Sequence, residues 1–508
     1  MENLSESRCF RAPVAVLDTV AEQLADVDLT LPDYCPDIEK ILKCTLIPKI
    51  QTKTLSGGQL QVDGSCTVNV LYVESGAKTI RCCEQSVDFS QRFSVRDTPE
   101  SFVILTRTKP EYINCRALSP RRLVMHGAFS LYVRVLSTAM TRLYTPPEGL
   151  ESLKRTVSCA GLSAFCQEQF TVSEEIAVSD KPAIESVLYS KVSANLTDVK
   201  AVTGKLMVSG ELGLRLFYLT DVESGETARL EYILPFSQIV DCKGVEENTQ
   251  NLLGCEVMSY DLRLKNDLMS DKPAVALDVK FCLTEEGYVI RDEEIITDVY
   301  STDFATVPSF ENLTVTNAVM PVSESFMEKL NFRVDNGKIG KILDLYADSV
   351  TMETAPGEKG MSVSGKINLC MVALDEKNVP VLVERTCDYR HVLSGTEGCG
   401  SLTFGKTTPG GISYRLSDDN AAEIRLELKI SGGAVKRETI RAVADVQLLE
   451  DSPIAADNCA LTLYFAEADE NLWQIAKTHN TRLDLLLAEN GLSALTIDSP
   501  QMLLIPKL

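Results

Sequence analysis

One strand-like segment occurs three times along the chain, and this repeat constrains the fold more strongly than any other feature. In each copy, apolar residues alternate with mostly polar ones around a glycine, which is Gly64, Gly210 or Gly365. The spacings between these glycines are 146 and 155 residues. Alternation with a period of two places one face of a strand on a core and the other towards water. The sequence therefore predicts three copies of one β unit of about 150 residues.

A second motif, Ile-x-x-Ile/Val-Leu, recurs upstream of the glycines with the same two spacings. It begins at Ile38, Ile184 and Ile339. The residue two positions before it is Pro36, Pro182 or Gly337. Because apolar residues three and four positions apart share one face of a helix, we expect a short helical turn at the entry of each unit, with Pro36 at its first position.

Each unit also contains a second alternating strand, at residues 123–133, 275–281 and 424–430. Turn-forming residues separate the strands at positions 57–58, 223–225, 375–378 and 432–433. We therefore expect a mainly β protein with three tandem antiparallel β-sandwich or barrel-like domains, at residues 1–150, 151–320 and 321–457. If these domains fold separately, limited proteolysis cuts the chain near residues 145–152, 305–325 and 451–458.

The charge balance argues against two classes of partner. The chain carries 50 basic and 72 acidic residues, a formal net charge of −22, without a long basic stripe, which disfavours nucleic acid and anionic lipid. No uncharged apolar run approaches the roughly 18 residues that a membrane helix needs. Residues 1–10 lack the basic and apolar regions of an export signal. These features predict a cytoplasmic protein without a membrane span.

The 16 cysteines are scattered, with Cys82-Cys83 as the only close pair and no C-x-x-C spacing. We interpret them as reduced core thiols, and extracellular disulfides are the competing interpretation. The three histidines, His126, His391 and His479, leave little material for a His-rich metal site or a Ser/His/Asp arrangement. No metal or cofactor is predicted.

Residues 400–407 match the phosphate-binding pattern G-x-x-x-x-G-K-[ST] of nucleotide hydrolases. A true site opens a helix after a buried strand, but here Pro-Gly-Gly at residues 409–411 prevents a helix from continuing. We therefore expect a glycine-rich loop, and little effect of Lys406→Ala. The acidic clusters at residues 174–175, 292–294 and 418–419 are interpreted as solvated loop charge and not as catalytic carboxylates. The sequence predicts no enzymatic activity.

The last fifty residues follow a helical pattern instead. Two short amphipathic helices are flanked by apolar strands at residues 461–465 and 502–505, which gives a strand-helix-helix-strand unit at residues 458–508. This unit resembles a LysM domain, whose landmarks stand at residues 464–466, 472–476, 490–492 and 503–506. The resemblance implies a shallow groove between the first strand–helix loop and the second helix–strand loop. In that family the groove binds the N-acetylglucosamine backbone of peptidoglycan or chitin.

The resemblance implies a binding site in these two loops. Its candidate partner- or glycan-binding residues are Asp469, Glu470, Asn471, Leu472, Trp473, Asp498, Ser499, Pro500 and Gln501. Asp469 and Pro500 replace glycines of the family pattern, and glycine is the residue that lets a sugar approach the backbone closely. We therefore expect these acidic loops to bind protein in preference to glycan. For Trp473, half-buried packing is the favoured interpretation, and contact with a partner or stacking on a sugar are the alternatives.

The combination of three repeats with one LysM unit resembles the SipL-type spore envelope proteins of anaerobic endospore formers. The resemblance implies a non-enzymatic scaffold in the mother-cell cytoplasm, at the forespore surface. It also implies that the LysM-bearing end docks onto a coat basement-layer ATPase or another spore envelope protein. A peptidoglycan-binding protein is the alternative function.

Overall fold

The computed structural model describes residues 9–96, 100–178, 181–265, 274–333, 339–418, 420–454 and 459–506. Strands account for 77% of the structure and helices for 3%, so the expected mainly β fold is confirmed. Gly337 and the boundary segment at residues 455–458 lie outside the described residues.

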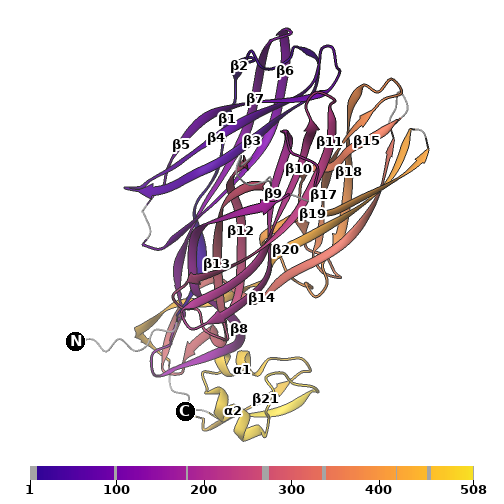
Figure 1. Cartoon of the computed structure of the whole chain (residues 1–508). Helices are drawn as coiled ribbons and strands as arrows, with labels where there is room; N and C mark the ends of the chain where they lie inside the picture. The colour runs from indigo at the N-terminus through magenta and orange to yellow at the C-terminus, as the bar shows by residue number, and fades with distance from the viewer. Residues whose placement is uncertain are drawn as a thin grey trace.

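The first unit is a sandwich of two antiparallel sheets (Figure 1). One sheet contains β3 (Ile38–Ser56), β4 (Gln59–Glu74) and β5 (Ile80–Ser94), with β4 in the middle. In the other, β7 (Arg122–Arg142) pairs with β1 (Cys9–Leu24), β2 (Val27–Thr30) and β6 (Phe102–Ser119). Alternate apolar residues of both sheets meet between them and form the core.

The second and third units repeat this plan. In the second, β9 (Ser186–Val202), β10 (Lys205–Asp221) and β11 (Glu226–Asp241) face β8 (Leu150–Ala177), β13 (Ala274–Ser301) and β12 (Gln250–Lys265). In the third, the first sheet contains β15 (Lys341–Val350), β16 (Glu353–Ala355), β17 (Ser362–Leu374) and β18 (Pro380–Val392). It faces β14 (Phe304–Arg333), β20 (Ala421–Pro453) and β19 (Ser401–Asp418). The third sandwich therefore begins at Phe304, before the expected boundary at residue 321.

The expected helical turn at the entry of each unit is wrong, because the motif lies at the start of a β strand in each unit. In the first unit, register shifts between Ile38 and Lys40 and between Ile41 and Lys43 each insert an extra residue into β3. A bulge changes the spacing of residues on one face from two to three. Ile38 and Ile41 therefore both face the core, and a helix-like spacing arises within a strand.

The last leucine of the motif faces the opposite way, towards the other units. Leu42, Leu188 and Leu343 all join one apolar cluster, which we call the central junction. Its buried members come from the outer faces of the β4, β10 and β17 sheets of the three units. They are Leu71, Ile80, Leu188, Phe217, Leu219, Tyr346, Cys370 and Val372. The three sandwiches therefore pack against one another around a shared core.

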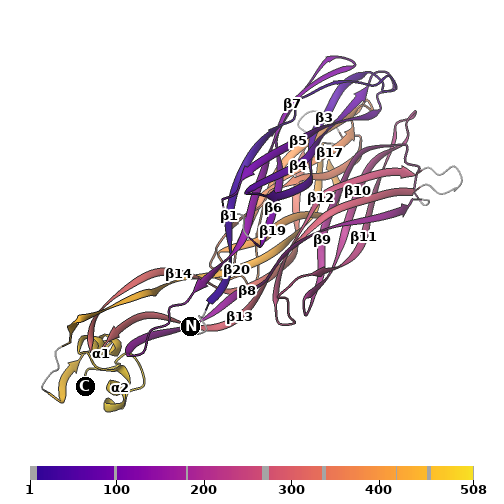
Figure 2. The ribbon, with the colours of Figure 1, turned by 90° about the vertical axis from the view of Figure 1, so that its left-hand side faces the viewer.

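Four strands continue beyond the sandwiches and form an elongated stalk (Figure 2). We define the stalk as residues 150–160 of β8, 290–301 of β13, 304–318 of β14 and 436–453 of β20. It has its own core, in which Val157, Ile295, Leu313, Val315 and Ile440 are buried. Residues 305–325, where limited proteolysis is expected to cut between separate domains, lie within β14 and pair with β20 along most of this length.

The glycine-rich match also belongs to a strand, and the expectation of a loop is wrong. Residues 401–407 lie in β19, with a register shift between Thr403 and Lys406. The Lys406 ammonium donates to the backbone oxygens of Ala194, at 2.6 Å, and Cys255, at 3.2 Å, in the second unit. Burial lowers the pKa of Lys406. This lysine is an internal cross-link, so Lys406→Ala is expected to disturb the contact between the second and third units.

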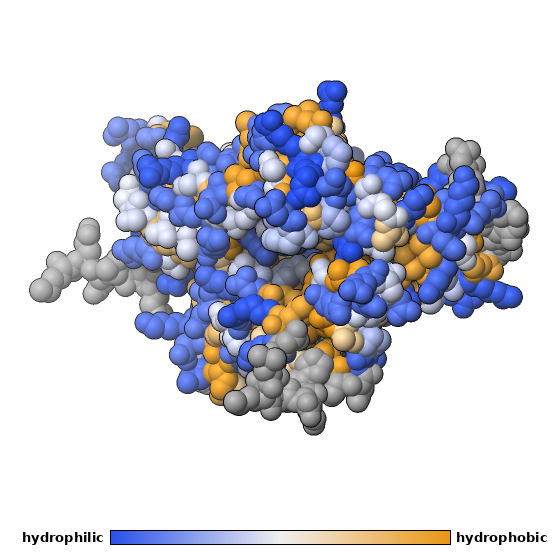
Figure 3. All heavy atoms as spheres, turned by 45° about the horizontal axis from the view of Figure 1, so that its top comes forward, coloured by the Kyte–Doolittle hydropathy of each residue, from blue (hydrophilic) through white to orange (hydrophobic). Residues whose placement is uncertain are grey.

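Several other expectations concern the surface and the thiols. The acidic residues 174–175 and 292–294 lie on β8 and β13 and not in loops, whereas His126 is exposed as its register predicts. All 16 cysteines are free thiols. No described helix is long and apolar enough to cross a membrane. The face of the molecule in Figure 3 is mainly hydrophilic, with several apolar patches.

Candidate functional site

The C-terminal unit has the expected strand-helix-helix-strand order. It contains β21 (Leu461–Ala466), α1 (Leu472–Thr478), α2 (Leu483–Asn490) and β22 (Gln501–Pro506), and the two strands pair antiparallel. Its core is formed by Ala466, Leu472, Trp473, Ile475, Ala476, Leu486, Ile497, Leu503 and Ile505. Gly491 caps α2 in the left-handed conformation, with a φ of 61°.

The structure brings the two predicted loops side by side. The Asp469 amide donates to Ile497 O at 2.8 Å, and the Ile497 amide donates to Glu470 O at 3.1 Å. Asp469 has a φ of 66°, in the left-handed region that favours glycine. The backbone therefore keeps a glycine-like conformation at this position although the side chain is a carboxylate.

Two of the candidate side chains have local structural roles. The Asn471 carboxamide oxygen accepts from the Trp473 amide at 2.8 Å and caps α1. The Glu470 carboxylate accepts from the Tyr464 hydroxyl at 3.1 Å and from the Glu467 amide at 3.2 Å. The remaining loop residues Asp469, Asp498, Ser499 and Pro500 are exposed, and Gln501 is half-buried.

Leu472 and Trp473 do not belong to the exposed part of the loops. The Trp473 side chain is 1% exposed and packs edge-on against Tyr300 of the stalk, with ring centroids 4.9 Å apart. Its indole N–H donates to Asp298 Oδ2 at 2.7 Å. Packing is therefore the role that the structure gives Trp473. In this arrangement it cannot serve as the exposed anchor for a partner.

Asp298 of β13 is the centre of the contact between the stalk and the C-terminal unit. Lys477 of α1 donates to its two carboxylate oxygens at 2.7 and 2.9 Å. Burial acts to raise the pKa of Asp298, but the bonds from Lys477 and Trp473 outweigh it and hold this pKa below its usual value. Nearby, the Tyr300 hydroxyl donates to Thr481 O at 2.7 Å. These contacts fix α1 against the stalk.

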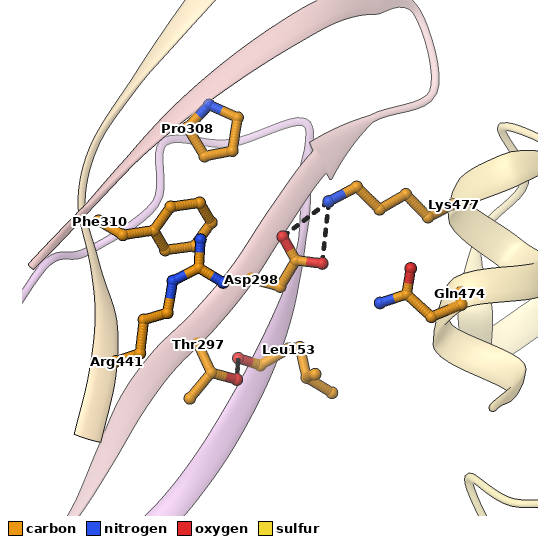
Figure 4. Close-up of a pocket in the computed structure, with 8 residues that line it drawn as sticks. All are labelled: Leu153, Thr297, Asp298, Pro308, Phe310, Arg441, Gln474 and Lys477. Carbon is orange, nitrogen blue, oxygen red and sulfur yellow. Dashed lines mark hydrogen bonds and ion pairs between the residues drawn. The ribbon is translucent and has the colours of Figure 1, made fainter. Parts of the chain in front are cut away.

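A pocket of about 560 Å³ lies beside this contact (Figure 4). It is lined by Leu153, Thr297, Asp298, Pro308, Phe310, Arg441, Gln474 and Lys477. The Arg441 guanidinium lies 3.7 Å from the centre of the Phe310 ring. Arg441 and Phe310 come from the stalk, whereas Gln474 and Lys477 come from α1, so the pocket has walls from both parts.

The sequence alone did not identify Asp298, Lys477 or Arg441. A signal was present around Asp298, because Ile295, Ile296, Val299 and Tyr300 are apolar on both faces of one strand. A strand end with two apolar faces needs a cover on each side. The C-terminal unit supplies part of that cover.

A second surface of the C-terminal unit is apolar and uncovered. Leu463 and Phe465 of β21 are each 63% exposed. Leu504 and Met502 of β22 are their cross-strand partners, so their side chains share the same outer face of the two-stranded sheet. We call Leu461, Leu463, Phe465 and Met502 the outer sheet face.

One group of potential metal ligands occurs among the described residues, and the space between these ligands is occupied by a lysine ammonium. Asp348, Cys370 and Glu384 of the third unit could place their ligand atoms around an ion. The Lys43 ammonium of the first unit lies among them, at 2.8, 2.9 and 2.5 Å. The arrangement therefore joins two units.

Fold and site together define a class of protein: tandem β-sandwich repeats packed around a shared core, with a small βααβ unit at the end of a stalk. The family model of the SipL SPOCS domain matches the chain twice, at residues 37–118 and 183–265. These ranges correspond to β3–β6 and to β9–β12. Two of the three units therefore match the SipL SPOCS domain, which supports a SipL-type, sporulation-related protein. Neither the curated proteins nor the solved structures contain a match.

Proposed function

We propose that the protein is a non-enzymatic scaffold of endospore envelope assembly that works in the mother-cell cytoplasm at the forespore surface. Its LysM-like C-terminal unit docks onto a protein of the coat basement layer, for which an ATPase is the expected candidate. The observation that carries this proposal is the outer sheet face, which stays uncovered while α1 of the same unit is held on the stalk.

The chemistry of the exposed surfaces favours a protein partner over a glycan. Leu463, Phe465 and Met502 offer a contiguous apolar surface of the kind found at protein interfaces. The adjoining loops carry the exposed carboxylates of Asp469 and Asp498, which suit a basic or amide-rich rim. A partner that combines an apolar centre with such a rim would satisfy both surfaces.

Peptidoglycan binding remains the second candidate function, and one observation favours it. The two loops pair through their backbones, and Asp469 keeps the left-handed conformation. A glycan that accepts the Asp469 and Pro500 side chains at the rim could therefore still lie along these loops.

The test uses the full-length chain to capture partners from extracts of sporulating cells. Phe465→Ser is expected to reduce capture of the basement-layer protein, because it removes apolar area from the outer sheet face. Ile233→Ser is the matched control, since Ile233 is 65% exposed on a strand of the second unit. Equal capture by both variants, together with sedimentation of the chain with purified peptidoglycan, would instead support the glycan-binding function.

A further inference from the structure

The pocket between the stalk and α1 is separate from the loops and from the outer sheet face. Its apolar lining residues are Leu153, Pro308 and Phe310. Cationic groups stand on opposite walls, with Arg441 on the stalk and Lys477 on α1 (Figure 4). In an otherwise acidic chain, two cations beside the single Asp298 carboxylate are a local reversal of charge.

Arg441 is the group best placed to receive a ligand. Its guanidinium stacks on the Phe310 ring. A stacked guanidinium keeps its N–H groups free, because they point outward in the guanidinium plane and not into the ring. Other arginines of this region have carboxylate partners. Arg155 pairs with Glu438, and Arg482 pairs with Asp484. The ring contact holds Arg441 in place without using its capacity for a bidentate bond to a carboxylate.

The net charge of the groups that line the pocket decides whether it favours a singly or a multiply charged anion. Asp298 lies between the two cations and already accepts from Lys477 and Trp473. With two cations and one carboxylate, the walls suit a ligand with a single negative charge better than a multiply charged phosphate. The exposed Gln474 amide adds a neutral donor on the α1 side.

We infer that this pocket binds a glutamate- or aspartate-bearing segment of a partner protein, with the carboxylate on Arg441 and Lys477 and a neighbouring apolar side chain on Phe310. Because its walls come from the stalk and from α1, the bound segment would connect the two and strengthen their contact. The site goes beyond the proposed docking of the outer sheet face, and its test involves neither that face nor any coat protein.

The single tryptophan of the chain provides the readout. Trp473 bonds to Asp298, which lines the pocket, so an occupant should change its fluorescence. The full-length protein is titrated with a synthetic Glu-Phe peptide flanked by glycines and blocked at both ends, and separately with the matching Gln-Phe peptide and with inorganic phosphate. We expect saturable binding of the acidic peptide, weakened by salt, and much weaker binding of the other two.

Variants locate the site. Arg441→Gln is expected to weaken binding of the acidic peptide roughly ten- to hundredfold, the usual effect of losing a charged hydrogen-bond partner. Gln474→Glu adds a carboxylate at a solvent-exposed position and should weaken binding as well, without a risk to folding. Arg437→Gln is the matched control, because Arg437 is an exposed arginine of the same strand that bonds to Ser401 outside the pocket.

Three results would overturn the inference. One is equal binding by Arg441→Gln and the parent chain, when circular dichroism shows both to be folded. Another is equal binding of the Glu and Gln peptides, which would make the contact apolar only. The last is phosphate binding as tight as that of the acidic peptide, which would make the pocket a simple ion site.

Discussion

At the scale of single residues, the repeat glycine is explained by an aromatic ring on one side and a backbone carbonyl on the other, which leave no room for a Cβ. Gly64, Gly210 and Gly365 stand opposite Phe89, Phe236 and Tyr389. In each pair the ring lies over the glycine, where a side chain would otherwise stand. The glycines are therefore required by close packing and not by a turn.

Gly210→Ala is expected to destabilise the fold by about 1–3 kcal/mol, because a Cβ would lie 2.5 Å from Phe236 Cζ and 2.6 Å from Asn195 O. Urea unfolding at equilibrium measures the change. Gly400→Ala is the control, since nothing lies within 4 Å of the added Cβ. Equal loss of stability in both variants would mean that backbone freedom, and not these close contacts, decides the effect.

Glu285 of β13 is a second residue with an unusual environment. It is 2% exposed, and neither carboxyl oxygen has a hydrogen-bond partner. Burial, followed by the nearby Cys242 thiol and Glu286, raises the pKa of Glu285 well above its usual value. The folded protein therefore holds this proton at pH values where the unfolded chain releases it. The protonated Glu285 carboxyl contributes fully to stability below the pKa that it has in the unfolded chain. This contribution is lost as the pH rises towards and through the pKa that it has in the folded protein.

Glu285→Gln is expected to make the protein more stable than the parent at pH 8, by at least about 1 kcal/mol, with a smaller difference at pH 5. The sign follows because the amide has no proton to lose. Thermal unfolding at both pH values gives the difference. Glu174→Gln, at an exposed position of β8, should show none. A difference that is the same at pH 5 and pH 8 would contradict a titrating Glu285.

At the scale of elements, the sequence predicted the strands but not what their outer faces contact. Alternation around Gly64 correctly predicted β4. However, residues 70–73 at its end are apolar without interruption, and all are buried. The same is true of residues 216–219 in β10 and 369–373 in β17. Such runs are typical of strands buried on both faces, and they could have indicated the central junction.

Bulges and contacts between residues remote in sequence explain the remaining differences between the sequence-based predictions and the structure. The spacing of Ile38 and Ile41 fits a helix as well as a bulged strand, and only the pairing of β3 with β4 decides between them. Within the candidate site, the two loops that the sequence pointed to pair through the backbones of Asp469, Glu470 and Ile497. The burial of Trp473 depends on Tyr300 and Asp298, which are remote in sequence and carry no local signal of that contact.

Lys43→Met tests the contact of β3 with the third unit. Burial acts to lower the pKa of Lys43, but Asp348 and Cys370 raise it overall, so the ammonium stays charged. Its removal leaves the Asp348 and Glu384 carboxylates without their cation. We expect a loss of about 1–3 kcal/mol, less than for a fully buried pair because Glu384 is 47% exposed and water screens it. Urea unfolding measures the loss, and Lys40→Met, at an exposed position, should be neutral.

At the scale of the whole molecule, each pair of units is joined by a lysine as well as by the central junction. Lys43 links the first unit to the third, and Lys280 links the second to the first through Gln51 O at 2.9 Å. Lys406 links the third to the second through Ala194 O at 2.6 Å. Because the three units share the central junction, unfolding of one unit is expected to expose the outer sheets of both others. We therefore expect the three units to unfold as a single cooperative body, whereas the sequence alone suggested three separately folding domains.

Leu188→Asp tests this cooperativity, since Leu188 is a buried member of the central junction. An unpaired carboxylate there costs several kcal/mol. We expect hydrogen exchange to accelerate in β4 and β17 of the other units as much as in β10, and unfolding to stay a single transition. In the parent chain, proteases should spare residues 305–325 because β14 is paired with β20 there. Ile233→Asp, on an exposed face of the second unit, is the control. Faster exchange confined to the second unit, or early cleavage at residues 305–325, would show instead that the units fold independently.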